Sequence, residues 1–283
     1  MHLVIHADIL EDSSGIAIEK ANNLHTIGFL QRDYTLLPEE LEPETETHDA
    51  YFLFQSKVDY PLTNAVWALN GDADFPDNKI EEVIDSFKNR NYTQTWWLGE
   101  HSTPANVEDT LTKLGLTRIE ADVPMMAADL TQMDFSELDV LSETKKIEVR
   151  RVNTGEDLTR WLGVIHEVYQ YPDAYIEALR YIFKVMVKDS RSALAQNFLA
   201  EIEDVPVGAS SLSLCEGLAG LYYVCTKREA RGQGVGTAVT LAPMREARER
   251  GYEVGILGAS QLGFGVYQRV GFKEYFKLQI YSG

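Results

Sequence analysis

Apolar positions in the last third of the chain alternate between short continuous runs and longer runs with helical spacing. Residues 218–226 form an apolar run of the length expected for a strand. Beyond a glycine-rich segment, Val235, Ala238, Val239 and Ala242 repeat at the spacing of an amphipathic helix. The sequence therefore predicts a strand, a glycine-rich loop and a helix in direct succession.

The predicted helix should end at Gly251, because a basic turn precedes this residue and glycine is favoured just beyond a helix C-terminus. Pro243 lies inside the helix and cannot donate a hydrogen bond to the carbonyl of Val239, so we expect a kink or a break there. The pattern further predicts a strand over 253–257, a helix over 260–269, a turn at Gly271 and Phe272, and a last pair of strands.

The preceding residues fit the same kind of domain. The pattern predicts a strand over 147–152, helices over 158–169 and 174–188, and two strands over 198–202 and 208–214 joined by a turn. Strands joined by a short turn are antiparallel, and helices separate the others. We therefore expect an α/β (α+β) fold with a mixed, mostly antiparallel sheet flanked by helices on both faces.

The first half of the chain shows a similar order of elements. The pattern predicts a strand over 95–99, a helix over 105–114, a turn at Gly115, and two strands around Pro124 within 118–130. A chain of 283 residues is about twice the usual length of a domain. We therefore interpret 1–130 and 146–283 as two domains, with the polar, acidic residues 131–145 as a linker.

The segment from Arg231 to Thr237 has the composition of a phosphate-binding loop. Glycines at 232, 234 and 236 lack the Cβ atoms that would keep an anion away from backbone N–H groups, and a helix start supplies unpaired donors. A Rossmann fingerprint needs a glycine where Thr237 stands, and a Walker loop needs a Gly-Lys-Ser/Thr sequence that is absent. For the loop alone, a plain glycine-rich turn is the alternative interpretation.

A second motif follows the loop, with one predicted strand between them. Tyr267 stands four positions before the glycine of the Gly271-Phe272 pair, while the loop itself carries Arg231, Gly234 and Gly236 in an Arg-x-x-Gly-x-Gly pattern. In both motifs, residues 146–283 resemble the GCN5-related N-acetyltransferase (GNAT) family. The two motifs together are far more specific than either alone.

The resemblance implies acetyl-CoA as the acyl donor and no metal. It implies that backbone amides of the loop bind the pyrophosphate, and that the preceding strand separates from its neighbour and pairs with the pantetheine arm. Tyr267, whose pKa is ordinarily about 10, would donate a proton to the departing CoA thiolate. The implied cofactor-binding residues are Val224, Cys225, Thr226, Arg231, Gly232, Gln233, Gly234, Val235, Gly236 and Thr237.

Residues 1–130 weakly resemble a degenerate second GNAT domain. When Gly115 is aligned with Gly271, Leu111 takes the place of Tyr267, so the proton donor is missing. The acidic segment 70–74, Asn-Gly-Asp-Ala-Asp, precedes the helix predicted over 79–90, where its carboxylates would repel phosphate. We expect a tandem arrangement in which the first domain has lost cofactor binding.

The general base and the acceptor pocket are less well marked. Glu201, Glu216 and His166 are candidate bases because they lie on or beside predicted elements of the second domain, but none belongs to a motif. In the family the two helices after the first strand line the acceptor pocket. The aromatic residues expected to meet substrate there are Trp161, His166, Tyr169 and Tyr175.

Charge is divided unevenly along the chain. Residues 1–145 hold 28 Asp and Glu against 9 Lys and Arg, a net of −19, and residues 146–283 hold 16 against 17, a net of +1. An anionic cofactor would be steered to the second half and a cationic amine could be drawn by the first, although acidic surface can also serve solubility alone. The acidic balance argues against nucleic acid as a partner.

Cysteine, histidine and hydropathy patterns restrict the other possibilities. Cys215 and Cys225 are the only cysteines, which excludes a disulfide framework and favours a reducing compartment. The histidines show no metal-ligand spacing, and no run approaches a membrane span. We interpret Cys225 as a small strand residue rather than an acyl-carrying nucleophile, and we expect a cytoplasmic monomer or homodimer without membrane association.

The function that fits these features is acetyl-CoA-dependent N-acetylation of a primary amine, on a small molecule or a peptide, by direct attack in a ternary complex. The alternative is a non-catalytic acyl-CoA-binding or sensing module. A nucleotide-binding domain of another fold is a third possibility.

Overall fold

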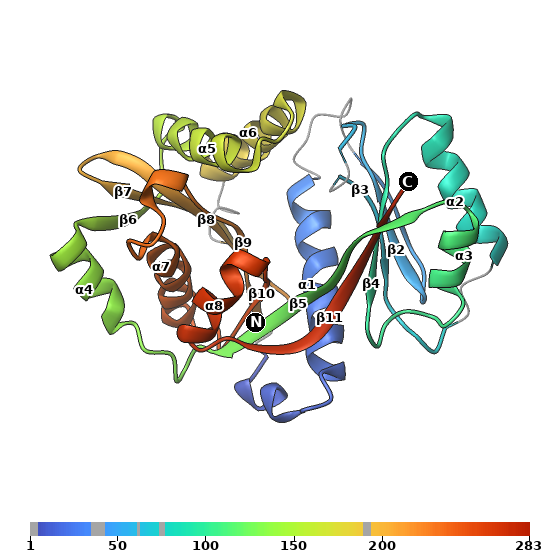
Figure 1. The fold of residues 1–283 in the computed structure, drawn as a ribbon, viewed down its shortest axis with the longest axis horizontal. Helices are drawn as coiled ribbons and strands as arrows, with labels where there is room; N and C mark the ends of the chain where they lie inside the picture. Colours follow the sequence, from blue (N-terminus) through green and yellow to red (C-terminus); the bar gives the residue numbers. More distant parts are fainter. Residues whose placement is uncertain (1–4, 35–42, 61–62, 74–76, 189–193) are drawn as a thin grey trace. The chain divides into compact units, whose positions relative to one another are not determined.

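The computed structural model describes all residues except 1–4, 35–42, 61–62, 74–76 and 189–193 (Figure 1). The chain divides into two compact units. Unit 1 contains Met1–Ser13 and Met126–Glu274, and unit 2 contains Ser14–Met125 and Tyr275–Gly283. Each unit is therefore discontinuous: the backbone N–H of Ala7 bonds to the Glu253 carboxylate within unit 1, while the last residues of the chain belong to unit 2.

Unit 1 has a mixed sheet in which most neighbours are antiparallel, as expected. The strand order is β10-β9-β8-β7-β6, with only β10 and β9 parallel among these five. The strands are β6 (Ile147–Arg151), β7 (Ala195–Ile202), β8 (Val205–Cys215), β9 (Leu218–Thr226) and β10 (Val254–Gly258). Each antiparallel pair joins two strands that are consecutive along the chain. Short turns connect β7 to β8 and β8 to β9, and the segment with α5 and α6 connects β6 to β7.

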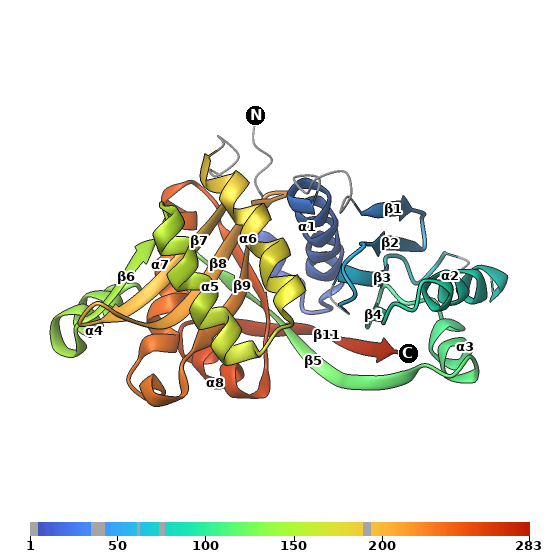
Figure 2. The same cartoon turned by 90° about the horizontal axis from the view of Figure 1, so that it is seen from above.

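Helices cover both faces of this sheet. Helices α5 and α6 lie on one face of β7, β8 and β9, and α7 lies on the other (Figures 1 and 2). The helices of unit 1 are α4 (Ser136–Lys145), α5 (Gly155–Tyr169), α6 (Asp173–Lys188), α7 (Val235–Glu249) and α8 (Gln261–Arg269), with short 3-10 turns at Ala7–Glu11 and Arg228–Ala230. The Thr154 side chain accepts a hydrogen bond from the Asp157 N–H, which caps the start of α5.

Helix α7 packs so closely on the sheet that it passes through its proline without a break. Val239 and Met244 are fully buried on either side of Pro243, and a Cβ added at Gly208 of β8 would lie 2.5 Å from Val235. The expected break at Pro243 is therefore wrong, because α7 continues through it, whereas the alternative of a kink stays a prediction. Burial of the apolar face outweighs the one backbone hydrogen bond that proline removes.

Three other expectations differ from the structure. Residues 117–129 form one continuous strand, β5 (Thr117–Asp129), rather than two strands around Pro124, and the chain ends in one strand, β11 (Lys273–Ser282), rather than a pair. The segment expected as a linker contains α4, whose Leu138 and Leu141 are buried in the core under α7. These two leucines form an apolar face on an otherwise polar helix. The high charge of the segment led to its interpretation as a linker.

Unit 2 is a second α/β unit with the order β1-β2-β3-β4-β11. Only β3 and β4 are parallel among these neighbours. Its strands and helices are α1 (Ile16–Tyr34), β1 (Glu44–Thr47), β2 (Tyr51–Gln55), β3 (Asn64–Ala68), α2 (Asp77–Asn89), β4 (Thr95–Gly99) and α3 (Val107–Lys113), followed by most of β5 and by the end of β11. In order along the chain, β3, α2, β4 and α3 correspond to β9, α7, β10 and α8 of unit 1.

Helix α1 places polar side chains at the ends of the parallel pair of unit 2. The Glu19 carboxylate, which is 1% exposed, accepts hydrogen bonds from the backbone N–H groups of His101 and Ser102 just beyond β4, at 3.1 and 2.8 Å. The Asn23 amide donates to the carbonyl of Ala68 at the end of β3. Burial raises the pKa of Glu19 despite these bonds. Side chains of the protein thus occupy the position that corresponds to the open end of β9 in unit 1.

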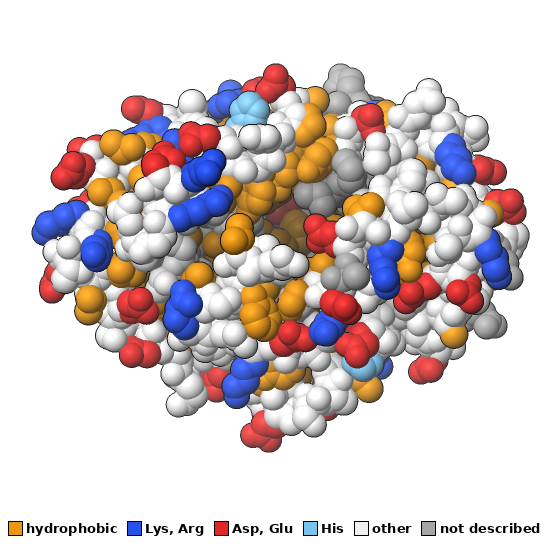
Figure 3. Space-filling model, in the orientation of Figure 1, with side chains coloured by type: hydrophobic (Ala, Val, Ile, Leu, Met, Phe, Trp, Pro, Cys, Tyr) orange, Lys and Arg blue, Asp and Glu red, His pale blue; other side chains and the backbone are white. Residues whose placement is uncertain are grey.

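The surface and the helices add two observations. Acidic and basic side chains are intermingled on the face that Figure 3 displays, although the first half of the chain is strongly acidic. Among the helices described, none has the length and apolar character needed to cross a membrane.

We predict that Glu19→Ala destabilises the protein by about 2–4 kcal/mol, because it leaves the backbone N–H groups of His101 and Ser102 without their acceptor, and the second of these is buried. Denaturant unfolding monitored by tryptophan fluorescence measures the change. Glu100→Ala, an exposed carboxylate in the adjoining loop, is the control and should shift the midpoint little. Equal stability of the Glu19 variant and the wild type would contradict this role.

Candidate active site

Strands β9 and β10 separate partway along their length. Their parallel register joins Ala219 to Gly255 and Gly220 to Ile256, and it extends no further in the described ladder, although β9 continues to Thr226. The separation that the resemblance implies is therefore present. Beyond Gly220, β9 is laddered to β8 alone among its described neighbours.

The β8–β9 ladder contains a bulge at the same place. Its register shifts so that Tyr223 and Val224 of β9 stand opposite Ser210 alone. Tyr223 has φ of 53°, in the left-handed region that a tyrosine adopts only when its surroundings impose it. A bulge of this kind redirects backbone groups of β9 away from the regular ladder.

Three aromatic residues from α5 and the start of α6 bond to the bulge. The Trp161 indole N–H donates to the Ser210 carbonyl at 3.0 Å, and the Tyr169 hydroxyl donates to the Val224 carbonyl at 2.8 Å. The hydroxyls of Tyr175 and Tyr223 lie 2.8 Å apart. Each side of the bulge is therefore held by a side chain from the helices above it.

The glycine-rich loop ends directly in helix α7. Gly232 and Gly234 have φ of 74° and 100°, and Gly234 is the N-cap residue of α7. A Cβ at Gly234 would lie 2.4 Å from the Leu141 side chain, so both conformation and packing require glycine there. A Cβ at Gly236 would meet nothing closer than the Thr226 hydroxyl at 3.7 Å, so the protein itself has room for a side chain at 236.

Backbone donors gather at this helix start. The first helical bond runs from the Ala238 N–H to the Gly234 carbonyl at 3.0 Å, so the N–H groups of Val235, Gly236 and Thr237 precede the helical hydrogen-bond ladder. The Arg231 side chain donates to the carbonyl of Thr226 at 3.3 Å, which ties the loop to the end of β9. These donors and the positive end of the α7 dipole suit a phosphate group.

Tyr267 projects from α8 into an enclosed environment. The residue is 6% exposed, its ring lies against Gly263 of the preceding turn, and it meets Phe272 edge to face at 6.2 Å. Its hydroxyl forms no hydrogen bond with any of the described residues. Burial, with a smaller contribution from Cys225, raises the pKa of the phenol, so it is protonated at neutral pH.

Cys225 lies on β9 next to the bulge and has the wrong environment for a nucleophile. Burial raises the pKa of its thiol to about 12, and the charge of Glu167 adds to that effect. Glu167 is in turn paired with Lys227 at 2.6 Å. The thiol therefore stays protonated at physiological pH, which fits its interpretation as a strand residue.

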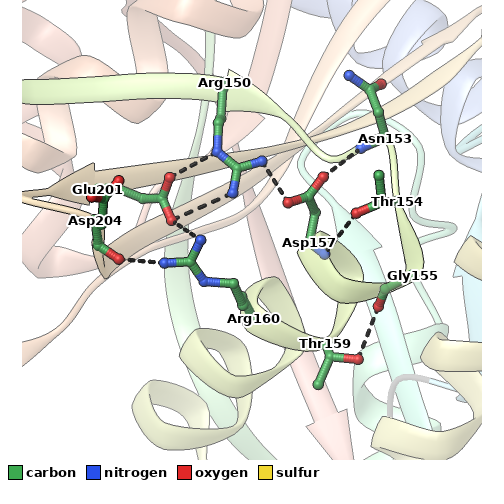
Figure 4. Close-up of polar contacts among 9 residues, drawn as sticks. All are labelled: Arg150, Asn153, Thr154, Gly155, Asp157, Thr159, Arg160, Glu201 and Asp204. Atoms are coloured by element: carbon green, nitrogen blue, oxygen red, sulfur yellow. Dashed lines mark hydrogen bonds and ion pairs between the residues drawn. The ribbon is translucent and has the colours of Figure 1, made fainter.

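Two of the three candidate bases, Glu201 and Glu216, are not brought to the bulge. The Glu201 carboxylate is bound by Arg150 at 2.7 Å and Arg160 at 2.6 Å, and Asp157 binds the other side of Arg150 (Figure 4). Glu216 is exposed in the turn before β9, at the far end of that strand from the loop. Glu201 thus belongs to an ion-pair network between β6, β7 and α5.

The expected acceptor-lining residues divide into two kinds. Trp161 and Tyr175 are 0% and 1% exposed, so neither can line an open pocket. Tyr169 is partly exposed and stacks on Tyr171 at 4.9 Å, and His166 is half-exposed beside Asp173. Sequence reasoning placed Trp161 and Tyr175 in the acceptor pocket and missed their contacts with β9, which no local motif encodes.

Comparison with protein families decides the nature of this unit. Residues 156–272 match the model of the Acetyltransferase (GNAT) family. These residues form a GNAT domain. The match contains α5, the bulge, the loop and Tyr267, and it confirms the resemblance that the sequence motifs indicated.

Solved structures show the same fold over nearly the whole chain. A GCN5-related N-acetyltransferase from Kribbella flavida has a TM-score of 0.67 at 15% identity, with 92% of this chain and 95% of that chain covered. A tandem GNAT protein from the clavulanic acid biosynthesis pathway has a TM-score of 0.59 at 14% identity, with 99% and 97% covered. A GCN5-related N-acetyltransferase from Sphaerobacter thermophilus has a TM-score of 0.60 at 16% identity, with 90% of this chain and 84% of that chain covered. No curated protein matches the chain in sequence.

These neighbours bear on both halves of the chain. The tandem protein supports a two-domain arrangement of GNAT-like units, as predicted.

Within the described residues, no group of three or more His, Cys, Asp or Glu side chains is placed to hold a metal ion.

We predict that Cys225 resists alkylation by iodoacetamide at pH 8 in the folded protein, because both its burial and its raised pKa suppress the thiolate. Peptide mass spectrometry after timed labelling measures the modified fraction, with urea-unfolded protein as the positive control. Rapid labelling of Cys225 in the folded state would contradict the environment described above.

Proposed function

We propose that the GNAT domain transfers an acetyl group from acetyl-CoA to a primary amine of a small molecule or peptide. The amine would attack the thioester directly in a ternary complex. The observation that carries the proposal is the loop before α7, where glycine stands at 236 although the fold leaves room for a side chain. A ligand that approaches the backbone explains the missing Cβ, whereas packing does not.

The loop residues are suited to the pyrophosphate. The N–H groups of Val235, Gly236 and Thr237 point out of the helix start, where the α7 dipole favours negative charge. Gly232 and Gln233 would contribute the preceding backbone, and Arg231 would add a positive charge beside Thr226. Their affinity for phosphate is electrostatic and requires no metal.

The end of β9 is suited to an extended amide-bearing chain. The end of the β9–β10 ladder at Gly220 supports a role for Val224, Cys225 and Thr226, which would pair with the pantetheine arm as an added strand. The bulge lies at the start of this stretch. A thioester at the end of the arm would then lie beside the redirected backbone of Tyr223 and Val224.

Acetyl-CoA supplies the acyl group as a thioester, whose sulfur must leave with an additional negative charge. Tyr267 can donate its proton to that sulfur, because its hydroxyl is buried, protonated and without a hydrogen-bond partner among the described residues. The C–N bond forms as the C–S bond breaks, and the proton that the amine loses balances the one that Tyr267 donates. The high pKa of Cys225 favours this direct route over an acyl-cysteine.

Gly236→Ala tests the loop. We expect CoA affinity to fall at least about tenfold, because a methyl group would stand where the phosphate approaches, while the melting temperature stays equal or rises. Calorimetric titration with CoA and a thermal melt measure the two quantities. Gly163→Ala, an exposed and equally unobstructed position in α5, is the matched control and should leave CoA affinity unchanged. Full affinity in Gly236→Ala would contradict the proposed cradle.

Tyr267→Phe tests catalysis. We expect the rate of acetyl transfer to fall by about 10²-fold or more while CoA affinity is retained, because only the proton donor is removed. Thiol release from acetyl-CoA over a panel of amines measures the rate. A wild-type protein that binds CoA but releases no thiol above the amine-free rate would favour a sensing module, and absence of CoA binding would overturn both functions.

A further inference from the structure

The bulge in β9 is a conformation that the strand would not hold by itself. A tyrosine in the left-handed region costs about 1–3 kcal/mol, and such residues persist only where neighbouring contacts impose them. The residues opposite and within the bulge are bonded by side chains of the helices above, rather than by the regular β8–β9 ladder. The source of the constraint is therefore α5 together with the first turn of α6.

We infer that Trp161, Tyr169 and Tyr175 are positioning residues for acyl transfer, which act by holding the β9 bulge in place. This inference rests on the proposed function. It assigns Trp161 and Tyr175 a role different from contact with the acceptor, for which both are too deeply buried.

Trp161 contacts both strands at the bulge. Its indole N–H donates to the carbonyl of Ser210, the β8 residue that stands opposite the two bulge residues in register. Its ring meets the Tyr223 ring edge to face at 5.8 Å and the Phe183 ring at 5.2 Å. The bond to Ser210 fixes the indole ring beside Tyr223, and the packed ring supports the left-handed conformation of that residue.

The two tyrosines fix the bulge residues themselves. Tyr175 holds the Tyr223 side chain through the pair of hydroxyls, and Tyr169 holds the Val224 carbonyl. A carbonyl fixed in this way also fixes the peptide plane that follows it, and with it the direction of the next N–H. The N–H group that would face the thioester oxygen is thereby oriented before the ligand binds. Such preorganised donors stabilise the negative charge that develops on that oxygen in the transition state.

Trp161→Phe removes the indole donor and keeps an aromatic ring. We expect kcat to fall roughly tenfold to a hundredfold, as a displacement of about 1 Å in a reacting group does, while CoA affinity changes less than about twofold. Amide hydrogen exchange of residues 222–226 should become faster in the free protein. Tyr169→Phe, which deletes only a partly exposed hydroxyl, should change kcat and exchange in the same direction by a smaller factor, and it serves where Trp161→Phe folds poorly.

Leu158→Ala separates this role from general stability. Leu158 is a buried residue of the same helix with no hydrogen bond to the bulge, so its loss should lower the melting temperature and leave kcat of the folded enzyme unchanged. If Trp161→Phe and Tyr169→Phe keep wild-type kcat, or lose only stability as Leu158→Ala does, the inference is overturned. Failure of the proposed function would look different, because the wild-type protein itself would then show no amine-dependent turnover.

Discussion

Strand β9 must satisfy its backbone hydrogen bonds against β8 while it separates from β10, and the rest of the active site depends on how it does both. Past Gly220 the ladder to β10 ends, and at Tyr223 and Val224 the ladder to β8 is interrupted. Unpaired backbone in a protein interior is costly, so such a strand is stable only when other groups take over its hydrogen bonds. The Tyr169 hydroxyl of α5 does so at the Val224 carbonyl, and the proposed ligand would do so along the edge that β10 has left.

The two units show what the same order of elements becomes under different constraints. In unit 1 the parallel pair β9 and β10 ends beside the glycine-rich loop, and at Gly236 the protein itself has room for a side chain. In unit 2 the parallel pair ends beneath Glu19 and Asn23, whose side chains bond to backbone beyond β4 and at the end of β3. A carboxylate there is incompatible with a phosphate, because two anions in a buried position repel each other strongly. The acidic segment at 70–74 and the leucine at 111 agree with the prediction that the first domain does not bind the cofactor, and that prediction is untested.

Local patterns in the sequence were sufficient to predict the loop before α7, the position of Tyr267 on a helix and most elements of unit 1, because these depend on short-range spacing. They were insufficient where distant segments decide the outcome. Pro243 does not break α7 because the sheet buries both sides of it, and α4 forms because Leu141 packs against Gly234, 93 positions later in the sequence. Glu201 is held by arginines of β6 and α5, and Trp161 bonds to a carbonyl on β8. No spacing rule relates such residues, so their roles become visible only in the fold.

The most direct test of the account is a crystal structure of the protein with CoA. The account predicts that diphosphate oxygens lie within about 3.2 Å of the backbone nitrogens of residues 235–237, with the pantetheine arm along β9 and its sulfur near the Tyr267 hydroxyl. A CoA molecule bound elsewhere, or no CoA bound at saturating concentration, would contradict it.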